Sequence, residues 1–377
     1  MKRLLFSLVA LLTLATTLQA EELPSREERL EVTRRVNEYL MTKRYADPTA
    51  VMPYYSRNKV YESNIWTRAV YYEGLMALYS ICPDNRYYDN AVRWADFHKW
   101  GMRRDDTTTR NADNYCCSQT YIDLYRLEPR PERIRKIIAL CDMLVNTPQV
   151  EDWTWIDAIQ MGMPVLVKLG TLKGDARYYE KAYEMYAWSR NTLAGGLYNE
   201  QEGLWWRDAD FVPPYAEPNG EDCYWSRGNG WVVAALVRVL EELPEDAAHR
   251  DLYINDLKTM CKALKACQRK DGFWNVSLHD ETNFGGKELT GTALFVYGMA
   301  WGINNGLLDR KEYLPVVTKA WNAMVREAVH PNGFLGYVQG TGKEPKDGQP
   351  VTYDSKPDFE DYGTGCFLLA GVEVYKL

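Results

Sequence analysis

Two aspartates and one arginine stand at the starts of apolar, helix-like segments of this chain. Asp157 follows Trp155 and precedes an apolar run, Asp113 precedes a second run, and Arg227 opens a third. Burial beside apolar side chains raises the pKa of a carboxyl group, which can then serve as a general acid. An arginine can bind a carboxylate through two parallel hydrogen bonds. These residue types favour acid–base chemistry on a substrate that carries a carboxylate.

Tryptophans gather at the same segment starts: Trp66, Trp155, Trp225 and Trp231. Aromatic faces stack on sugar rings, and 13 Trp and 27 Tyr are typical of carbohydrate-active proteins, although a large helical core gives the same bias. Each residue alone also has a structural interpretation, since an aspartate at a helix start commonly caps the helix and a tryptophan there commonly packs. The joint pattern, on one end of the fold, is what indicates a site.

Other chemistries find little support in the sequence. The four histidines are widely spaced and lack metal-ligand spacing: His98, His249, His279 and His330. There is no nucleophile elbow, phosphate-binding loop or dinucleotide fingerprint. We therefore expect neither a metal nor a cofactor.

The elements that must position these residues are two alternating sets of helices. The outer set has an apolar stripe at helical spacing and is predicted at 25–43, 86–100, 131–146, 176–192, 251–268 and 311–328. The inner set is apolar nearly all round and rich in small residues, and is predicted at 64–81, 112–127, 155–171, 226–243, 290–305 and 361–376. Six inner and six outer helices predict an all-α fold, an (α/α)6 barrel.

The loops of this barrel are unequal in length. Loops leading out of the inner helices are mostly short, whereas several loops leading into them are long: 45–63, 193–225, 269–289 and 329–360. Long ordered loops on a compact scaffold usually carry function. The functional face is therefore expected at the N-terminal ends of the inner helices, whose unpaired N–H groups and positive dipole ends favour an anionic ligand.

The first residues read as an export signal. Lys2 and Arg3 precede an apolar run from Leu4 to Leu14, and small residues lead to Ala20. We expect a signal peptide at 1–20, a single catalytic domain at 21–377, and a periplasmic or secreted protein.

The net charge of −7 argues against nucleic acid or an anionic membrane as a partner. No later segment is apolar for long enough to span a membrane. The eight cysteines are expected to be mostly free, buried thiols, because most fall inside helical segments. The oligomeric state is left open.

Three motifs give the chain a family resemblance. The string Trp-Ser-Arg-Gly-Asn-Gly-Trp at 225–231, Trp-Ile-Asp at 155–157 with the following Met-Gly-Met-Pro, and Gly-Thr-Ala at 291–293 resemble glycoside hydrolase family 105. Those enzymes are unsaturated rhamnogalacturonyl hydrolases, related to unsaturated glucuronyl hydrolases. The resemblance covers about 30–377 and implies an (α/α)6 barrel.

The resemblance also implies a substrate, an oligosaccharide left by a polysaccharide lyase with a Δ4,5-unsaturated uronic acid (galacturonyl or glucuronyl) at its non-reducing end. Asp157 matches the acid/base of the family and Asp113 its second active-site aspartate. Substrate-contacting positions are matched by Trp155, Trp225, Arg227 and Trp231, with Trp66 as a weaker match. Asp157 would protonate the vinyl ether and activate water, while Arg227 and the helix N-termini would hold the carboxylate.

The chain departs from the family pattern at two positions. Ala158 stands where many members have a second aspartate, and Arg207 stands where some members carry a histidine. Arg207 is accordingly the next candidate for binding a carboxylate. Two other functions remain open, an inverting glycosidase of another (α/α)6 family with Asp113 and Asp157 as acid and base, and a non-catalytic carbohydrate-binding barrel. Neither the sugar after the scissile bond nor the galacto or gluco origin of the uronide can be assigned.

Overall fold

The computed structural model describes residues 21–377, apart from residue 45, residues 55–57 and residues 358–359. The expected signal peptide at 1–20 lies outside the described residues. Within them, no helix is both long and apolar enough to cross a membrane. All eight cysteines are free thiols and six of them are buried, which confirms the expectation for these residues.

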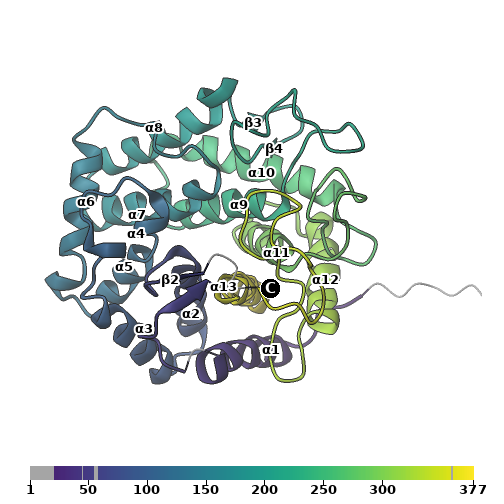
Figure 1. The fold of residues 1–377 in the computed structure, drawn as a ribbon, viewed down its shortest axis with the longest axis horizontal. Helices are drawn as coiled ribbons and strands as arrows, with labels where there is room; N and C mark the ends of the chain where they lie inside the picture. The colour runs from purple at the N-terminus through teal and green to yellow at the C-terminus, as the bar shows by residue number, and fades with distance from the viewer. Residues whose placement is uncertain (1–20, 45, 55–57, 358–359) are drawn as a thin grey trace, which may run out of the picture.

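Six helical segments of the described chain form a closed inner ring (Figure 1). They are α2 (Trp66–Ile81), α4 (Ala112–Tyr115) with α5 (Ser118–Leu127), α7 (Asp157–Lys173), α9 (Ser226–Leu240), α11 (Leu289–Asn304) and α13 (Asp361–Lys376). Contacts run from α2 through α5, α7, α9, α11 and α13 and back to α2. The ring closes because α9, α11 and α13 are buried on almost every side, as their all-round apolar sequences predict.

The outer ring consists of α1 (Arg26–Glu38), α3 (Asn85–Phe97), α6 (Arg135–Val145), α8 (Arg177–Asn191), α10 (Arg250–Ala266) and α12 (Arg310–Glu327). α1 packs on α13, α3 on α2, α8 on α7, α10 on α9, and α12 on α11, while α6 contacts α8. The predicted all-α (α/α)6 barrel is thus confirmed, with bounds close to those expected from the apolar periodicity.

Two local features differ from the prediction. The inner segment expected at 112–127 is broken at Cys116 and Cys117 into α4 and α5. Two small hairpins interrupt the long loops, β1 (Met52–Tyr54) with β2 (Lys59–Tyr61) and β3 (Tyr198–Asn199) with β4 (Leu204–Trp205). Strands of two or three residues are too short to show an alternating pattern, so these hairpins could not be predicted from the sequence.

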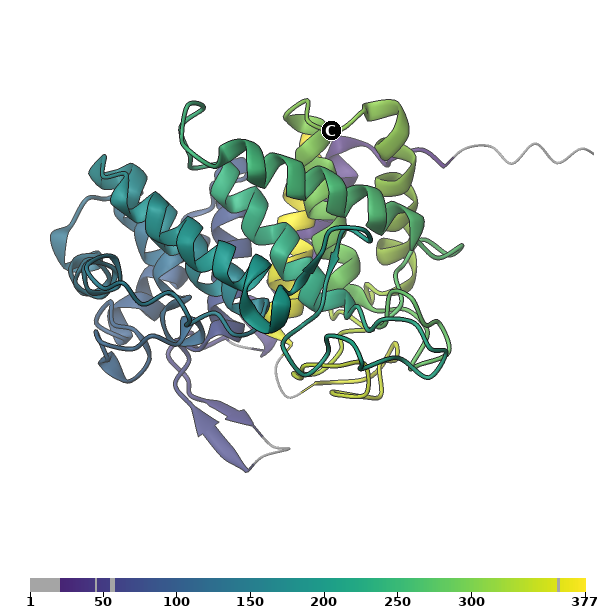
Figure 2. The same ribbon diagram turned by 90° about the horizontal axis from the view of Figure 1, so that it is seen from above.

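Short helical turns complete the described secondary structure: a π-helical turn at Tyr39–Arg44 and 3-10 turns at Arg103–Asp105, Pro131–Arg133 and Leu193–Gly195. The hairpin of β1 and β2 projects from one end of the barrel, and long connecting loops gather at the same end (Figure 2). This is the end at which the inner helices begin, as the unequal loop lengths predicted.

A closed set of buried polar contacts joins four inner helices in the interior of the barrel. Glu73 in α2 accepts hydrogen bonds from Gln160 Nε2 in α7 at 2.8 Å and from Cys116 Sγ at 3.3 Å, and Arg238 Nε in α9 lies 3.6 Å away. Arg238 Nε donates to Gln119 Oε1 in α5 at 2.7 Å, and Gln119 Nε2 donates to the carbonyl of Gln160 at 2.9 Å. We call these five residues the polar ring.

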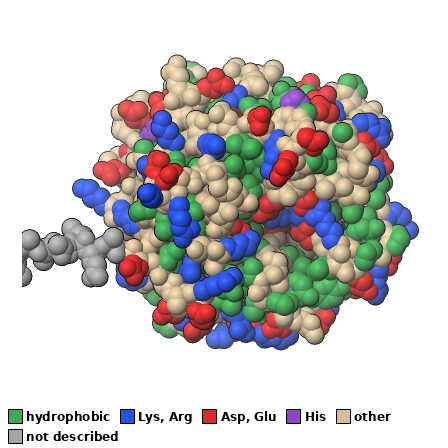
Figure 3. Space-filling model, turned by 180° about the vertical axis from the view of Figure 1, so that it is seen from behind, with side chains coloured by type: hydrophobic (Ala, Val, Ile, Leu, Met, Phe, Trp, Pro, Cys, Tyr) green, Lys and Arg blue, Asp and Glu red, His purple; other side chains and the backbone are tan. Residues whose placement is uncertain are grey.

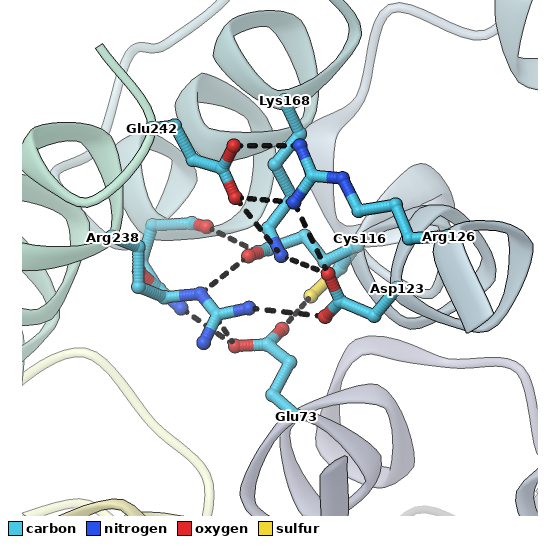
Figure 4. A network of polar contacts seen from close by, with 9 residues as sticks. Glu73, Cys116, Asp123, Arg126, Lys168, Arg238 and Glu242 are labelled. Atoms are coloured by element: carbon cyan, nitrogen blue, oxygen red, sulfur yellow. Dashed lines mark hydrogen bonds and ion pairs between the residues drawn. The ribbon is translucent and has the colours of Figure 1, made fainter. Parts of the chain in front are cut away.

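Further ion pairs continue from the polar ring toward the opposite end of the barrel (Figure 4). Lys168 pairs with Asp123, and Arg126 donates to both carboxylate oxygens of Glu242 at 2.6 Å. That end is hollowed, and acidic and basic side chains lie together in the hollow (Figure 3). The cavity there measures about 500 Å³ and is lined by Glu73, Asp123 and Arg238 among others.

Glycines permit the close approach of α2 and α13. A Cβ added at Gly365 would lie 2.3 Å from the carbonyl oxygen of Val70, and one added at Gly74 would lie 2.6 Å from the carbonyl oxygen of Gly365. Both contacts involve backbone atoms, which cannot move aside as a flexible side chain can. The close approach brings the first and last inner helices together and so closes the ring.

Gly365→Ala is therefore expected to lower the free energy of unfolding by about 1–3 kcal/mol, the usual cost of overpacking a filled core. Denaturant unfolding followed by circular dichroism measures this change. Glu31→Ala, on the exposed face of α1, is the matched control and should change stability by less than about 0.5 kcal/mol. Equal stability of the two variants would show that the helices can move apart at no cost.

Candidate active site

A cavity of about 420 Å³ opens at the loop end of the barrel. Its lining includes five of the residues singled out from the sequence: Trp66, Asp113, Trp155, Asp157 and Arg207. They come from the first turns of α2, α4 and α7, from the residue two positions before α7, and from the loop that follows β4. The starts of three inner helices, α2, α4 and α7, thus meet at one cavity, half of the six that the sequence predicted.

Asp157 is the first residue of α7, and its carboxylate does not cap the helix. The residue at the cap position is Ile156, without a side-chain cap, and Asp157 Oδ2 instead accepts from Arg207 Nη2 at 3.2 Å. Its other oxygen, Oδ1, is buried without a partner among the described residues. Burial raises the pKa of Asp157, although the positive charges of Arg207 and Arg227 oppose the rise.

Backbone pairing fixes Arg207 beside Asp157. The amide of Ile156 donates to the carbonyl of Arg207 at 3.0 Å, and Trp155 forms an isolated antiparallel bridge with Asp208. The guanidinium is held from its far side, because Arg207 Nη1 donates to Asp208 Oδ2 at 2.6 Å. Asp157 and Arg207 therefore form a partly exposed ion pair in the cavity wall.

Asp113 is not a helix cap either. Asn111 caps α4, since its Oδ1 accepts from the amide of Asp113 at 2.9 Å. Burial and the negative charge of Asp157 raise the pKa of Asp113 to about 7, against the opposing charges of Arg207 and Arg103. Two carboxyl groups that repel each other in this way share protons near neutral pH, which suits acid–base chemistry.

The terminal N–H groups of Arg227 are not free to bind a ligand in the cavity. Its side chain is buried, Nη1 donates to the carbonyl of Gln339 at 2.7 Å, and Nη2 donates to the carbonyl of Gly340 at 2.8 Å. The guanidinium also lies over the ring of Trp225 at 4.6 Å. The expectation that Arg227 binds a substrate carboxylate is not supported by these contacts, because both terminal nitrogens already serve backbone carbonyls of the 329–360 loop.

The two remaining predicted tryptophans lie behind the cavity wall. Trp225 is buried and its Nε1 donates to Gln339 Oε1 at 2.9 Å. Trp231 is buried and meets Trp66 edge to face, with ring centroids 6.0 Å apart. Of these three rings Trp66 lines the cavity. Trp225 supports the 329–360 loop through Gln339, and Trp231 packs against the ring of Trp66.

Sequence reasoning missed several residues at the cavity mouth: Tyr54, Tyr61, Arg103, Thr341 and Lys343. Arg103 lies over the ring of Tyr61 at 4.7 Å, and the hydroxyls of Tyr54 and Thr341 are 2.5 Å apart. The tyrosines in the string Met-Pro-Tyr-Tyr at 52–55 and at 61 were the available signal for an aromatic wall.

A salt bridge between two loops borders the same mouth. Lys343 Nζ donates to Asp210 Oδ2 at 2.8 Å, which joins the 329–360 loop to the loop after β4. Within the described ranges, no group of three His, Cys, Asp or Glu side chains is arranged to hold a metal ion. The chemical groups at hand in this cavity are therefore the two interacting carboxyls of Asp113 and Asp157, a third carboxyl at Asp347, three cationic side chains and aromatic rings.

The barrel and the pair of interacting carboxyl groups in its cavity are those of a glycoside hydrolase. The family model for Glycosyl Hydrolase Family 88 matches residues 32–377. The chain belongs to glycosyl hydrolase family 88. This membership speaks against both an unrelated (α/α)6 glycosidase and a non-catalytic barrel.

Two similar proteins support the assignment. An unsaturated 3S-rhamnoglycuronyl hydrolase of Formosa agariphila is 32% identical over 333 residues, which are 83% of this chain and 84% of that protein. The solved structure of a glycosyl hydrolase family 88 protein from Bacteroides vulgatus has a TM-score of 0.84 and 33% identity, covering 94% of this chain and all of that one.

The family 105 resemblance is confirmed for the wider group. A structure from Salmonella enterica described as a possible member of family 105 shares the fold, with a TM-score of 0.74 at 21% identity over 95% of this chain and 96% of that one.

The raised pKa of Asp113 predicts a pH-dependent effect on stability. A carboxyl whose folded pKa lies above its unfolded value stabilises the fold when protonated, and that stabilisation is lost as the pH rises to about 7. Asp113→Asn should therefore raise the free energy of unfolding at pH 8 relative to the native protein, and by about 1–2 kcal/mol more than at pH 5.

Denaturant unfolding at both pH values measures the difference. Asp106→Asn, at an exposed position, provides the control and should show no such trend. A pH-independent effect of Asp113→Asn would mean that the Asp113 carboxyl keeps its ordinary acidity.

Proposed function

We propose that this enzyme removes a Δ4,5-unsaturated uronic acid from the non-reducing end of lyase-generated oligosaccharides, with rhamnose as the following sugar. The observation that carries the proposal is the grouping of Asp157, Asp113 and Arg207 in one cavity of a family 88 barrel. Rhamnose is suggested by the name of the Formosa agariphila relative, an unsaturated 3S-rhamnoglycuronyl hydrolase.

The proposed reaction begins at the vinyl ether of the unsaturated ring. Asp157 gives its proton to C4, and the positive charge that develops at C5 is shared with the ring oxygen. Water adds to C5 and returns a proton to Asp157. The resulting hemiketal opens and releases the sugar that follows. The ring double bond makes a nucleophilic carboxylate unnecessary, unlike in ordinary retaining glycosidases.

Asp113 has a tuning role in this proposal. Its carboxyl interacts with that of Asp157, and like charges in one site keep a proton on the pair at neutral pH. A carboxyl poised near the working pH is the most effective proton donor and acceptor.

Arg207 is the proposed carboxylate ligand in place of Arg227. Arg207 lines the cavity and stands next to Asp157, whereas the terminal nitrogens of Arg227 are bound to carbonyl groups. The starts of α2 and α7 add positive dipole ends to the same wall.

The mouth of the cavity suits the sugar after the scissile bond. Tyr54 and Tyr61 offer aromatic surface, Arg103 offers positive charge beyond what one carboxylate needs, and Lys343 offers a second cation that is paired with Asp210. We propose that these two cations face an anionic substituent, such as a sulfate ester, on the rhamnose. Export to the periplasm or medium, proposed from residues 1–20, would bring the enzyme to such fragments.

Ultraviolet absorbance tests the function. The conjugated double bond of an unsaturated uronide absorbs in the far ultraviolet, and hydration of this bond abolishes the absorption band. We expect the absorbance of an unsaturated uronyl–rhamnose disaccharide to fall on incubation with the enzyme, with release of rhamnose. Sulfated and unsulfated disaccharides should be compared, along with ones whose second sugar is galactose or glucosamine. Unchanged absorbance across the panel would contradict the proposed function.

Asp157→Asn should lower turnover in this assay by about 10²–10⁴-fold, because the nearly isosteric amide cannot donate the proton. Asp152→Asn is a suitable control, since Asp152 pairs with Arg110 and is not among the residues lining the cavity. A variant at position 157 that keeps more than about a tenth of the native rate would remove this residue from the mechanism.

A further inference from the structure

The contacts of Arg207 are unevenly distributed over its guanidinium group. Nη1 is fixed by a 2.6 Å bond to Asp208, whereas Nη2 has only a long 3.2 Å bond to Asp157. Nε is buried and has no acceptor among the described residues. Nε and Nη2 form one edge of the planar group, the edge that binds carboxylates with two parallel bonds. The strong binding edge of Arg207 is thus occupied only by a weak contact to Asp157.

Asp157 is incompletely bonded in the same way. Its Oδ1 is buried without a partner among the described residues, and its Oδ2 has the single long bond to Arg207. A buried polar atom left without a hydrogen bond is destabilising, so both side chains favour a new partner. One donor of Arg207 and one acceptor of Asp157 are therefore left without partners among the described residues, in two side chains that both line the cavity.

We propose that Arg207 holds Asp157 in its ionised form until a substrate carboxylate takes the Nε–Nη2 edge of Arg207, displacing Asp157, which then binds the proton it will deliver. This inference rests on the proposed function. It adds that binding of the substrate carboxylate causes Asp157 to take up its proton. An uncharged analogue would bind without causing this protonation.

The charges around Asp157 give this exchange its direction. Before binding, Arg207 and Arg227 favour the ionised form of Asp157, and Asp113 and Asp208 oppose it. Arg227 stays bound to the carbonyls of Gln339 and Gly340. Once a substrate carboxylate neutralises Arg207, Asp157 has lost its nearest cation and gained an anionic neighbour. Both changes raise the affinity of Asp157 for a proton.

The proton comes from solvent, directly or relayed by Asp113, which solvent then reprotonates, so the pair of carboxyls gains a proton when the substrate binds. No bond to carbon changes in this step, because the exchange replaces one carboxylate by another on Arg207 and adds H⁺ to Asp157. An arginine suits this role better than a histidine, since it stays charged throughout the working pH range.

Proton uptake can be counted by titration calorimetry in buffers of different ionisation enthalpy. The probe is the lyase-generated unsaturated disaccharide, titrated into the Asp113→Asn variant. This substitution is expected to slow turnover, and it leaves Asp157 as the remaining carboxyl of the pair. We expect uptake approaching one proton per disaccharide at pH 7–8, and little uptake for the methyl ester of the same disaccharide. Equal uptake for acid and ester, or none for either, would overturn the proposal.

Kinetics of Arg207→Gln give an independent result. Arg207→Gln removes the ligand of the substrate carboxylate, so turnover of the acid should fall. The ester loses no such contact, and without the cation Asp157 is protonated more readily, so turnover of the ester should fall less. A change of one pKa unit alters the protonated fraction about tenfold, so the ratio of ester to acid turnover should rise about tenfold. Arg93→Gln, at an exposed position of α3 that does not line the cavity, should leave this ratio unchanged.

A loss of both activities in equal proportion in Arg207→Gln would mean a merely structural role, and thermal unfolding of each variant identifies misfolding. The two proposals fail separately. If the native enzyme leaves the absorbance of the disaccharide unchanged, the proposed function fails. If the absorbance falls, but acid and ester take up equal numbers of protons or the ester ratio does not rise in Arg207→Gln, the proposed protonation of Asp157 on substrate binding fails alone.

Discussion

The contact of Glu73 and Arg238 in the polar ring, two buried side chains 3.6 Å apart, is the constraint on which the site depends. Glu73 accepts hydrogen bonds from Gln160, three residues after Asp157, and from Cys116, three residues after Asp113. One buried carboxyl group is therefore bonded to both segments that carry the reactive groups. Removing one partner of a buried ion pair leaves an uncompensated charge and typically costs 3–5 kcal/mol. The spacing of the two aspartates is therefore set beneath the cavity and not within it.

A second constraint acts from the loop side. Gln339 is held by Trp225 through its side chain and by Arg227 and the Tyr362 hydroxyl through its carbonyl, and its own Nε2 donates to the carbonyl of Asp347 at 2.7 Å. The family string at 225–231 thus organises the segment that brings Thr341 and Lys343 to the cavity. A buried arginine bonded to carbonyls positions a loop as rigidly as a short element of secondary structure would.

The sequence was sufficient for the barrel because each inner helix carries its own all-round apolar pattern, and the first-turn positions of Asp113, Asp157 and Trp66 follow from those helix starts. It was not sufficient for Arg227, whose partners lie more than a hundred residues away at Gln339. The tightness of that contact is a property of loop packing, and local residue types do not encode it. The hairpin with Tyr54 was missed for a related reason, because strands of three residues leave no periodicity.

The polar ring also bears on how the enzyme handles a chain. The loop-end cavity and the cavity at the opposite end share no lining residue, and the ring of Glu73, Gln119, Gln160 and Arg238 lies between them. A sugar chain cannot thread through a pocket that is blind at its base. Both products must leave by the mouth through which the substrate entered before another chain end can follow. Such an enzyme works distributively, one encounter for each bond, and its output is governed by the number of free ends and not by the length of the polymer.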